Sequence, residues 1–412
     1  MTVAHRFLEF CSDHLAKVNA AGLTTAIRKV SGSSLSRKIN LNGQLVTNFC
    51  SLNYMGYGDD ERVISAMLEN VQKYGTGLAS SRTVLDSEQH CLFEDELALF
   101  KRSSGCKLIN TGYNASYGIM EILCKSPNSF GVRSGLPRAH VFYDALVHAS
   151  IRESLGNNQI NSTAYKHLNY DNLEDRISKN KEDEITKFIV TDSIFSMHGG
   201  IADVKKLLEI AKKYDALLIL DNAHSDGIYG REGRGIAEMQ GITSEEDLKY
   251  IFNAGTLSKT FSQMGGFITL PKDFSDVVPL SHYGYIFSVA LPTFQVATLR
   301  TVLAMIIGED GDRRRRKLHD TSEFLRHTLK EKGFDIGNSV SHIAPVMVGD
   351  EGVCKRAEHS LVEKGIFVKA IHWPAVKKGG ALLRLALTAN HDFEDVEHLT
   401  ESLVRVRDKL RF

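Results

Sequence analysis

From about residue 60 to residue 290, segments whose apolar residues have helical spacing alternate with short apolar runs of strand length. The helical segments are Asp60–Lys73, the stretch after Gly112, and Val204–Tyr214. The strand candidates are Lys107–Asn110, Phe188–Thr191, Ala216–Leu220 and Tyr250–Asn253. Strands that alternate with helices connect as βαβ units, which build a mostly parallel sheet with helices on both faces. The pattern therefore predicts an α/β fold.

The pattern changes after Pro292 in this 412-residue chain. Helical stretches are followed by three strand candidates and a final helix at Asp392–Leu410, which is typical of a smaller α+β domain of ordinary size. The strand candidates are His342–Val348, Ile366–Ala370 and Leu382–Leu387. The first residues combine a helix at about His5–Asn19 with a hairpin turn at Leu41-Asn42-Gly43-Gln44. The expected divisions are an N-terminal arm (1–45), a large domain (46–292) and a small C-terminal domain (293–412).

Charge and composition argue against several classes of function. Fifty basic residues balance fifty acidic ones, so no net charge favours nucleic acid as a partner. No long apolar run predicts a membrane span, and charges interrupt the apolar N-terminal stretch, unlike in a signal peptide. The six scattered cysteines lack the spacing of a metal site and indicate a cytoplasmic protein. We interpret the basic run Arg313–Arg316 as a solvated helix face rather than a site for nucleic acid or anionic lipid.

A lysine and an aspartate each follow one of the strand candidates. The amine of Lys259 can form a Schiff base with an aldehyde cofactor, and the hydroxyls of Thr256 and Ser258 can donate hydrogen bonds to a phosphate. Asp221 lies at the edge where open α/β sheets bind ligands, and its carboxylate can pair with a protonated pyridine nitrogen. The alternatives are a surface lysine in a hydroxyl-rich loop and an aspartate that caps a helix.

Gly112 lies between a predicted strand and a predicted helix. The free N–H groups of Tyr113 and Asn114 and the helix dipole would there face an anion such as phosphate. His148 follows an apolar stretch and can present its ring to a flat cofactor, and His224 follows the same strand candidate as the aspartate. Each has an ordinary alternative, namely a plain strand–helix connection or a histidine satisfied within the fold.

Eight motifs occur in order along the chain. They are Gly75-Thr-Gly-Leu-Ala-Ser-Ser-Arg82, Gly112-Tyr-Asn-Ala115, His148-Ala-Ser150, Asp192-Ser-Ile-Phe-Ser-Met197, Asp221-Asn-Ala-His224, Gly255-Thr-Leu-Ser-Lys259, Phe287-Ser-Val-Ala-Leu-Pro292 and Leu383-Arg-Leu-Ala-Leu-Thr-Ala-Asn-His391. The series resembles the α-oxoamine synthases, which are fold-type I enzymes dependent on pyridoxal 5'-phosphate. The resemblance covers about residues 45–400, and it depends on the order and spacing of the motifs rather than on any one of them.

The resemblance implies the fold-type I transferase architecture, with a large domain whose mostly parallel sheet lies between helices and a smaller C-terminal α+β domain. It implies that Lys259 holds pyridoxal 5'-phosphate and moves the substrate's α-proton, while Asp221 pairs with the pyridine nitrogen. His148 would stack on the cofactor ring, and His224 would bond its 3'-oxygen. The remaining residues expected at the cofactor are Gly112, Tyr113, Asn114, Asp192, Thr256 and Ser258.

On the substrate side, the resemblance implies that Arg384 binds the amino-acid carboxylate, a task that suits a planar guanidinium. Asn53 and Arg82 are expected as further substrate-binding residues. The family joins an amino acid to an acyl-CoA or an acyl-carrier-protein thioester, normally with loss of CO2, and gives an amino ketone. Its members are expected to be homodimers, because their sites lie between subunits.

The chain departs from the family pattern at several positions. Leu52 stands where an asparagine is usual, Asp192 where many members have glutamate, and Asn222 where an acidic residue is common. Val289 stands where members have a threonine that reaches the partner subunit's phosphate site, and the stretch Ser126–Pro137 is longer than usual. Some of these features are similar to the branch that makes quorum-sensing ketones, which suggests a medium- or long-chain acyl group and a signalling ketone precursor.

Two other functions remain open on the sequence alone. An aminotransferase or lyase of fold type I would share Lys259 and Asp221 without using an acyl thioester. A catalytically inert subunit of a heterodimeric synthase would lack the lysine, which this chain has.

Overall fold

The computed structural model describes residues 3–20, 28–124, 138–180 and 185–412. The main strands are β4 (Gly105–Ile109), β5 (Arg138–Asp144), β6 (Asn161–Tyr165), β7 (Ile185–Asp192), β8 (Ala216–Asp221), β9 (Ile251–Thr256) and β10 (Gly266–Leu270). They form a seven-stranded sheet in the order β4-β10-β9-β8-β7-β5-β6. All neighbours from β9 to β6 are parallel, whereas β10 is antiparallel to both β9 and β4. The predicted α/β class is confirmed.

The four strands predicted in this region are all present, while β5, β6 and β10 were not predicted. β8 is central and almost completely buried, which explains its continuous apolar run. β6 reads Asn-Ser-Thr-Ala-Tyr and lies at the edge of the sheet, where exposed positions tolerate polar residues. The long stretch noted at Ser126–Pro137 falls outside the described residues.

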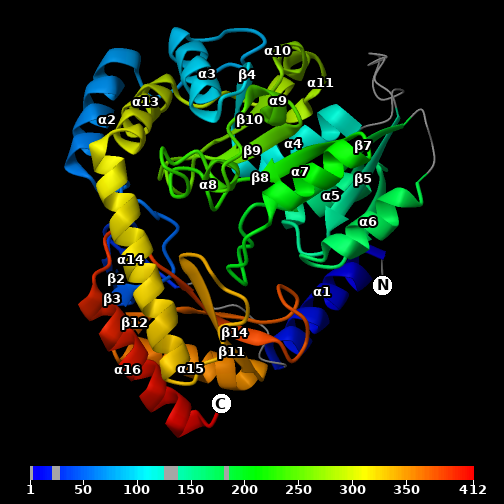
Figure 1. Ribbon diagram of the computed structural model, residues 1–412. Coiled ribbons are helices and arrows are strands. Elements are labelled where there is room, and N and C mark those ends of the chain that lie inside the picture. The colour runs from blue at the N-terminus through cyan, green and yellow to red at the C-terminus, as the bar shows by residue number, and fades with distance from the viewer. Residues whose placement is uncertain (1–2, 21–27, 125–137, 181–184) are drawn as a thin grey trace.

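Helices cover the sheet on both faces, as Figure 1 shows. Their bounds are α2 (Glu61–Tyr74), α3 (Glu88–Lys101), α4 (Gly112–Cys124), α5 (Ala149–Asn157), α6 (Tyr170–Ser178), α7 (Val204–Lys213) and α13 (Thr293–Ile307), with short helices α8 (Ile236–Met239), α9 (Glu245–Leu248), α10 (Lys272–Ser275), α11 (Val278–Ser281) and α12 (Tyr283–Ile286). In α7 the side chain of Asp203 caps the first turn by accepting a hydrogen bond from the N–H of Lys206. The apolar face predicted for this helix is buried against the sheet.

The C-terminal part contains two smaller sheets. Strands β11 (Ile343–Gly349), β13 (Lys369–Ile371) and β14 (Ala381–Ala386) form one, in the order β11-β14-β13. Strands β1 (Val30–Ser31), β2 (Lys38–Leu41), β3 (Gln44–Asn48) and β12 (Ile366–Phe367) form the other. Helix α15 (Glu351–Glu363) packs against strands of both sheets, α16 (Phe393–Leu410) packs against α15 and α14 (Glu309–Glu331), and α1 (Val3–Ala20) precedes them.

The predicted hairpin is present, with positive φ at both Asn42 and Gly43. The segment Ile366–Ala370, predicted as one strand, instead supplies β12 and β13 to different sheets. Because β12 pairs with β3, the N-terminal hairpin joins a sheet with the C-terminal part. We keep divisions after residues 45 and 292 as a proposal for the domain organisation.

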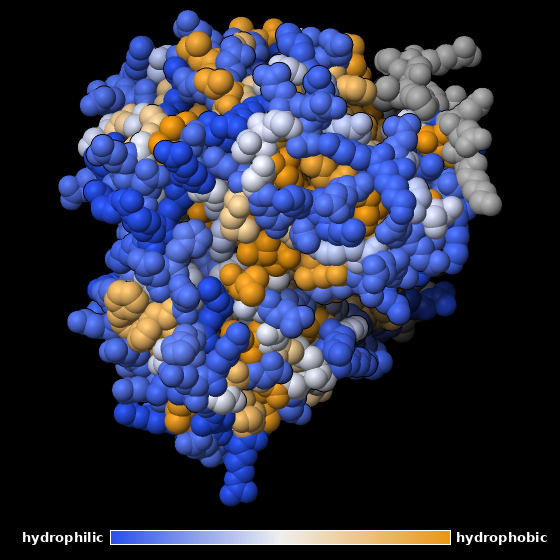
Figure 2. Space-filling model, in the orientation of Figure 1, coloured by the Kyte–Doolittle hydropathy of each residue, from blue (hydrophilic) through white to orange (hydrophobic). Residues whose placement is uncertain are grey.

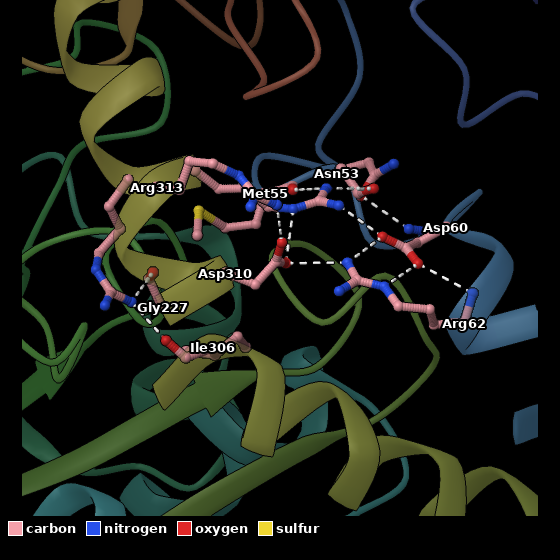
Figure 3. Close-up of polar contacts among 12 residues, drawn as sticks. Asn53, Met55, Asp60, Arg62, Gly227, Ile306, Asp310 and Arg313 are labelled. Carbon is pink, nitrogen blue, oxygen red and sulfur yellow. Dashed lines mark hydrogen bonds and ion pairs between the residues drawn. The ribbon is translucent and has the colours of Figure 1, made fainter. Parts of the chain in front are cut away.

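The interpretation of the basic run on α14 as a solvated face is correct for Arg313 and Arg316, which are exposed, and wrong for the two arginines between them. The side chains of Arg314 and Arg315 are only 16% and 5% exposed. Arg314 donates to the carbonyls of Met55 and Gly56, and Arg315 donates to those of Ile306 and Gly227. Figure 3 labels Met55, Ile306 and Gly227 among the residues whose polar contacts gather at this helix. Two arginines of the run therefore bind turns that lie 259 and 88 residues away from them in the sequence.

No helix in the described part of the chain is long and apolar enough to cross a membrane. Figure 2 shows a largely hydrophilic face, with hydrophobic residues gathered toward its middle, between the large-sheet part above and the C-terminal part below.

Candidate active site

The carboxyl ends of three neighbouring parallel strands meet at one edge of the large sheet. β7 ends at Asp192, β8 at Asp221 and β9 at Thr256, and the two aspartates are register partners. Ligands of open α/β sheets bind outside this edge. A cavity of about 290 Å³ lies there. The predicted residues that line it are Gly112, Tyr113, His148, Asp192, Asp221, His224, Thr256, Ser258 and Lys259.

The N-terminus of α4 forms one wall of the cavity. Gly112 packs so closely on Thr256 that a Cβ at position 112 would overlap the threonine side chain. The hydroxyls of Thr256 and Ser258 lie 2.8 Å apart beside this helix end. Free N–H groups, the helix dipole and two hydroxyls together make an anion site.

Asn114 does not line the cavity. Its N–H donates to Thr111 Oγ1 at 3.0 Å, and its side-chain amide donates to Asn110 at 2.7 Å. Both groups of Asn114 are therefore hydrogen-bonded to neighbouring residues of the protein, whereas Gly112 and Tyr113 line the cavity.

Lys259 lies at one end of a line of polar side chains. Its Nζ is 2.9 Å from His224 Nε2, and His224 Nδ1 is 2.7 Å from the hydroxyl of Tyr54. That hydroxyl also accepts a hydrogen bond from Arg384 at 3.5 Å. Tyr54, which the sequence did not single out, therefore connects the predicted carboxylate-binding arginine to the histidine beside the lysine.

Burial controls the charges of these groups. It lowers the pKa of Lys259 to about 8, against the opposing effect of Asp221. Burial also holds the pKa of His224 well below its usual value, and the positive charges of Lys259 and Arg384 add to the effect. At neutral pH the histidine is therefore uncharged, and an appreciable fraction of the lysine is an amine.

The two aspartates differ in their surroundings. Asp221 accepts hydrogen bonds from Ser116 Oγ at 2.7 Å and from the N–H of Ala223 at 3.0 Å. A carboxylate has about four acceptor positions, so Asp221 can still accept from a ligand. Burial, together with the neighbouring Asp221, raises the pKa of Asp192, whose Oδ1 accepts from the N–H of His148.

Three predicted substrate-binding residues lie outside the cavity lining. Arg384 is buried on β14 and donates through Nε to the carbonyl of Ser196 at 2.7 Å. Asn53 contacts the backbone at residues 35 and 58 as well as the side chain at residue 262, which joins three loops. Arg82 is engaged by Asp86 and Glu94 in buried or half-buried ion pairs. Arg384 is connected to His224 of the cavity through Tyr54, and Asn53 is connected to the carbonyl of Lys259 through the hydroxyl of Ser262.

The cavity residues fit pyridoxal phosphate. A partly buried lysine with a lowered pKa can bind its aldehyde, and the cradle at Gly112, which a Cβ would fill, can bind its phosphate. Asp221 can bind the ring nitrogen from the end of β8. These groups converge on one enclosed space from three elements, as a rigid aromatic cofactor requires.

Comparisons with known proteins agree with this arrangement. Residues 46–403 match the family described as aminotransferase class I and II. The 8-amino-7-oxononanoate synthase of Petrotoga mobilis is 32% identical over 98% of this chain and 99% of its own. A putative 8-amino-7-oxononanoate synthase of Acetivibrio thermocellus is 33% identical over 96% of this chain and 97% of its own. The serine palmitoyltransferase of S. paucimobilis, solved with bound pyridoxal phosphate and myriocin, has a TM-score of 0.88 at 26% identity and full coverage of both chains.

Proposed function

The chain belongs to the class I and II aminotransferase family, as a pyridoxal-phosphate-dependent acyltransferase of the α-oxoamine synthase type, and we propose that it joins a small α-amino acid to an acyl thioester with loss of CO2. The observation that carries the proposal is the position of Lys259. It lines the cavity with its amine beside His224, together with Asp221, and hydrogen bonds through His224 and Tyr54 connect it to Arg384.

Each residue has a task in this reaction. Pyridoxal phosphate, when bound, supplies an aldehyde for amines and a ring that withdraws electrons from the α-carbon of the amino acid. Lys259 binds the cofactor, and its free amine accepts the proton from the substrate's α-carbon. Asp221 holds a proton on the ring nitrogen, while the N-terminus of α4 binds the phosphate. Arg384 binds the carboxylate of the amino acid.

The names of the relatives indicate which amino acids can serve as the amino donor. An 8-amino-7-oxononanoate carries its amine on a carbon that bears one methyl group, so that product contains the skeleton of an alanine-sized donor. The structural relative is named for serine and a palmitoyl group. We therefore propose alanine or serine as the donor here.

The second substrate to define is the acyl thioester, and in particular the length of its acyl chain. The relatives' names point to a seven-carbon acid chain in one case and a palmitoyl chain in the other. The departures at Leu52 and Asp192 suggest a medium- or long-chain group and a signalling ketone precursor, although the relatives named above are not named for signalling. We propose an acyl chain of at least seven carbons as the common part of these indications.

A homodimer is the proposed assembly. The exposed apolar side chains Phe287 and Val84 lie on two loops that hydrogen-bond to each other, through the N–H of Ala290 and the carbonyl of Ser80. Phe287 is 71% and Val84 is 82% exposed, and apolar groups so exposed are common at interfaces. Light scattering at several concentrations should give twice the mass of the chain, and a stable monomer would contradict this assembly.

The reaction is tested with purified enzyme, alanine, serine or glycine, and acyl-CoA thioesters of increasing length. We expect thiol release and an amino ketone, identified by mass spectrometry, and a loss of about 1,000-fold or more in Lys259→Ala. Amine transfer to a 2-oxo acid without any acyl thioester would instead identify an aminotransferase. Thiol release at the background rate for every chain length would contradict the proposed condensation.

A further inference from the structure

Tyr54 is a fully buried residue to which the proposed reaction gives no task. Its hydroxyl lies 2.7 Å from His224 Nδ1 and 3.5 Å from Arg384 Nη2. On the other side of the imidazole, His224 Nε2 lies 2.9 Å from Lys259 Nζ. Four side chains from four separate segments thus form one line of hydrogen bonds between the carboxylate-binding arginine and the lysine.

The direction of these hydrogen bonds follows from the chemistry of the first one. A guanidinium can only donate, so the Tyr54 oxygen accepts from Arg384. The remaining proton of that hydroxyl points to the other close partner, His224 Nδ1, which therefore accepts. A neutral imidazole that accepts at Nδ1 carries its proton on Nε2.

The proton on Nε2 then determines whether the amine or the ammonium form of Lys259 can hydrogen-bond to His224. An amine has a lone pair and can accept a hydrogen bond from Nε2–H, whereas an ammonium group is a donor only. Two donors 2.9 Å apart repel each other, so the ammonium form is disfavoured at this position. In the change from ammonium to amine, one N–H bond of Lys259 breaks, the proton goes to solvent and the electron pair stays on nitrogen.

We propose that Tyr54 is a positioning residue that keeps the proton of His224 on Nε2 and thereby favours the free-amine form of Lys259, which can bind the aldehyde or accept the α-proton. The assignment depends on the proposed function for the roles of Lys259 and Arg384, and it adds the group that sets their protonation. The lowered pKa of the lysine agrees with it.

Other charged groups also face the lysine and act in parallel. Asp221 on β8 and Asp192 on β7 favour the ammonium form, while Arg384 on β14 favours the amine. For the imidazole, the neighbours Arg384, His342 and His148 all favour the neutral ring. Removal of the Tyr54 hydroxyl leaves these groups in place, so it isolates the effect of the hydrogen bond.

The test compares the full-length wild-type chain, stripped of cofactor, with Tyr54→Phe, which retains the ring and removes the hydroxyl. Nitrogen-15 NMR of the histidines reports the tautomer of His224, identified by its loss in His224→Gln. The pH dependence of the rate at which added pyridoxal phosphate binds to Lys259 reports the pKa of the amine. Tyr57→Phe is the matched control, because Tyr57 is equally buried on the same loop and packs under Arg314 rather than on His224.

We expect wild-type His224 to carry its proton on Nε2. In Tyr54→Phe we expect a mixture of tautomers and a midpoint of the pH–rate curve raised by about one unit, equivalent to a tenfold slower reaction below the midpoint. Tyr57→Phe should change neither measurement. A wild-type His224 protonated on Nδ1, or an unchanged pH midpoint in a folded Tyr54→Phe, overturns the proposal. Neither readout involves an acyl substrate, so failure of the condensation assay and failure of this inference are distinguishable.

Discussion

Lys259 shows at the scale of one residue how the fold changes ordinary side-chain chemistry. An exposed lysine is almost entirely protonated at neutral pH, whereas burial in this cavity lowers the pKa to about 8. The same burial makes the guanidinium of Arg384 a strong partner for a carboxylate, because few water molecules compete with it. Both effects require the side chains to be enclosed, and they would be absent from an open loop.

The first prediction concerns Arg384→Lys. A lysine retains the charge and loses the planar fork, so the KM for the amino acid should rise by about 10- to 100-fold, with a smaller change in kcat. Steady-state kinetics measures both constants. As a control, the affinity for an amine that lacks the carboxylate should be nearly equal in both enzymes. An equal loss for the amino acid and for this amine would show that Arg384 does not bind the carboxylate.

Helix α14 is the element that holds the site loops together. Arg314 binds the turn that follows Tyr54, and Arg315 binds the turn that follows the loop of His224. The 2.7 Å contact between Tyr54 and His224 thus lies between two turns that are both attached to one helix. Arg314 and Arg315, two of the four arginines in the run, therefore act as a brace that holds these two turns together.

The second prediction tests this brace. Arg314→Ala removes two bonds to backbone carbonyls, a contact with the ring of Tyr57 and the partner of Asp60 and Asp310, which should lower the free energy of unfolding by about 3–5 kcal/mol. Urea denaturation measures the change. Arg313→Ala is the control: its side chain is 71% exposed and pairs with Asp310 alone among the described residues, so we expect a loss below about 1 kcal/mol. Equal losses in both variants would refute the bracing role.

Buried neutral histidines make the whole molecule sensitive to acid. Burial lowers the pKa of His90 and of His391 to about 4, compared with 6.5 for a solvent-exposed histidine. His391 stacks on Phe49 and accepts a hydrogen bond from the N–H of Thr388. Between pH 6.5 and pH 4 the unfolded chain binds protons that the folded chain does not, so the free energy of unfolding falls as the pH decreases.

The third prediction follows from this window. The free energy of unfolding should be nearly constant above pH 6.5 with respect to these groups and should decrease toward pH 4, by about 3 kcal/mol for each histidine at 1.36 kcal/mol per pKa unit. Urea denaturation at several pH values measures it. His391→Asn, whose side-chain oxygen can replace Nδ1 as acceptor, should have a shallower slope. A wild-type stability that does not change between pH 7 and pH 5 would contradict the assignment.

Sequence periodicity predicted several buried elements, although it missed the interior strands β5 and β10. β8 and α7 were correctly located, since a strand buried on both faces and an amphipathic helix each show a pattern within a few residues. The edge strand β6 was missed, because its exposed positions are polar. The division of Ile366–Ala370 between two sheets was missed as well, since the partners of β12 lie more than 300 residues away.

The sequence alone determined the chemical types at the site: a lysine, an aspartate and a glycine turn, each following a strand that local patterns could identify. The tertiary structure decided which side chains meet. Tyr54 lies 170 residues from His224 and 330 from Arg384, and no local pattern records contacts at such separations. The same holds for Arg314 and Arg315, whose charges look solvated in the sequence until distant carbonyl groups fold against them. The local sequence determined which chemical groups are present, and long-range packing determined which of these groups lie in contact.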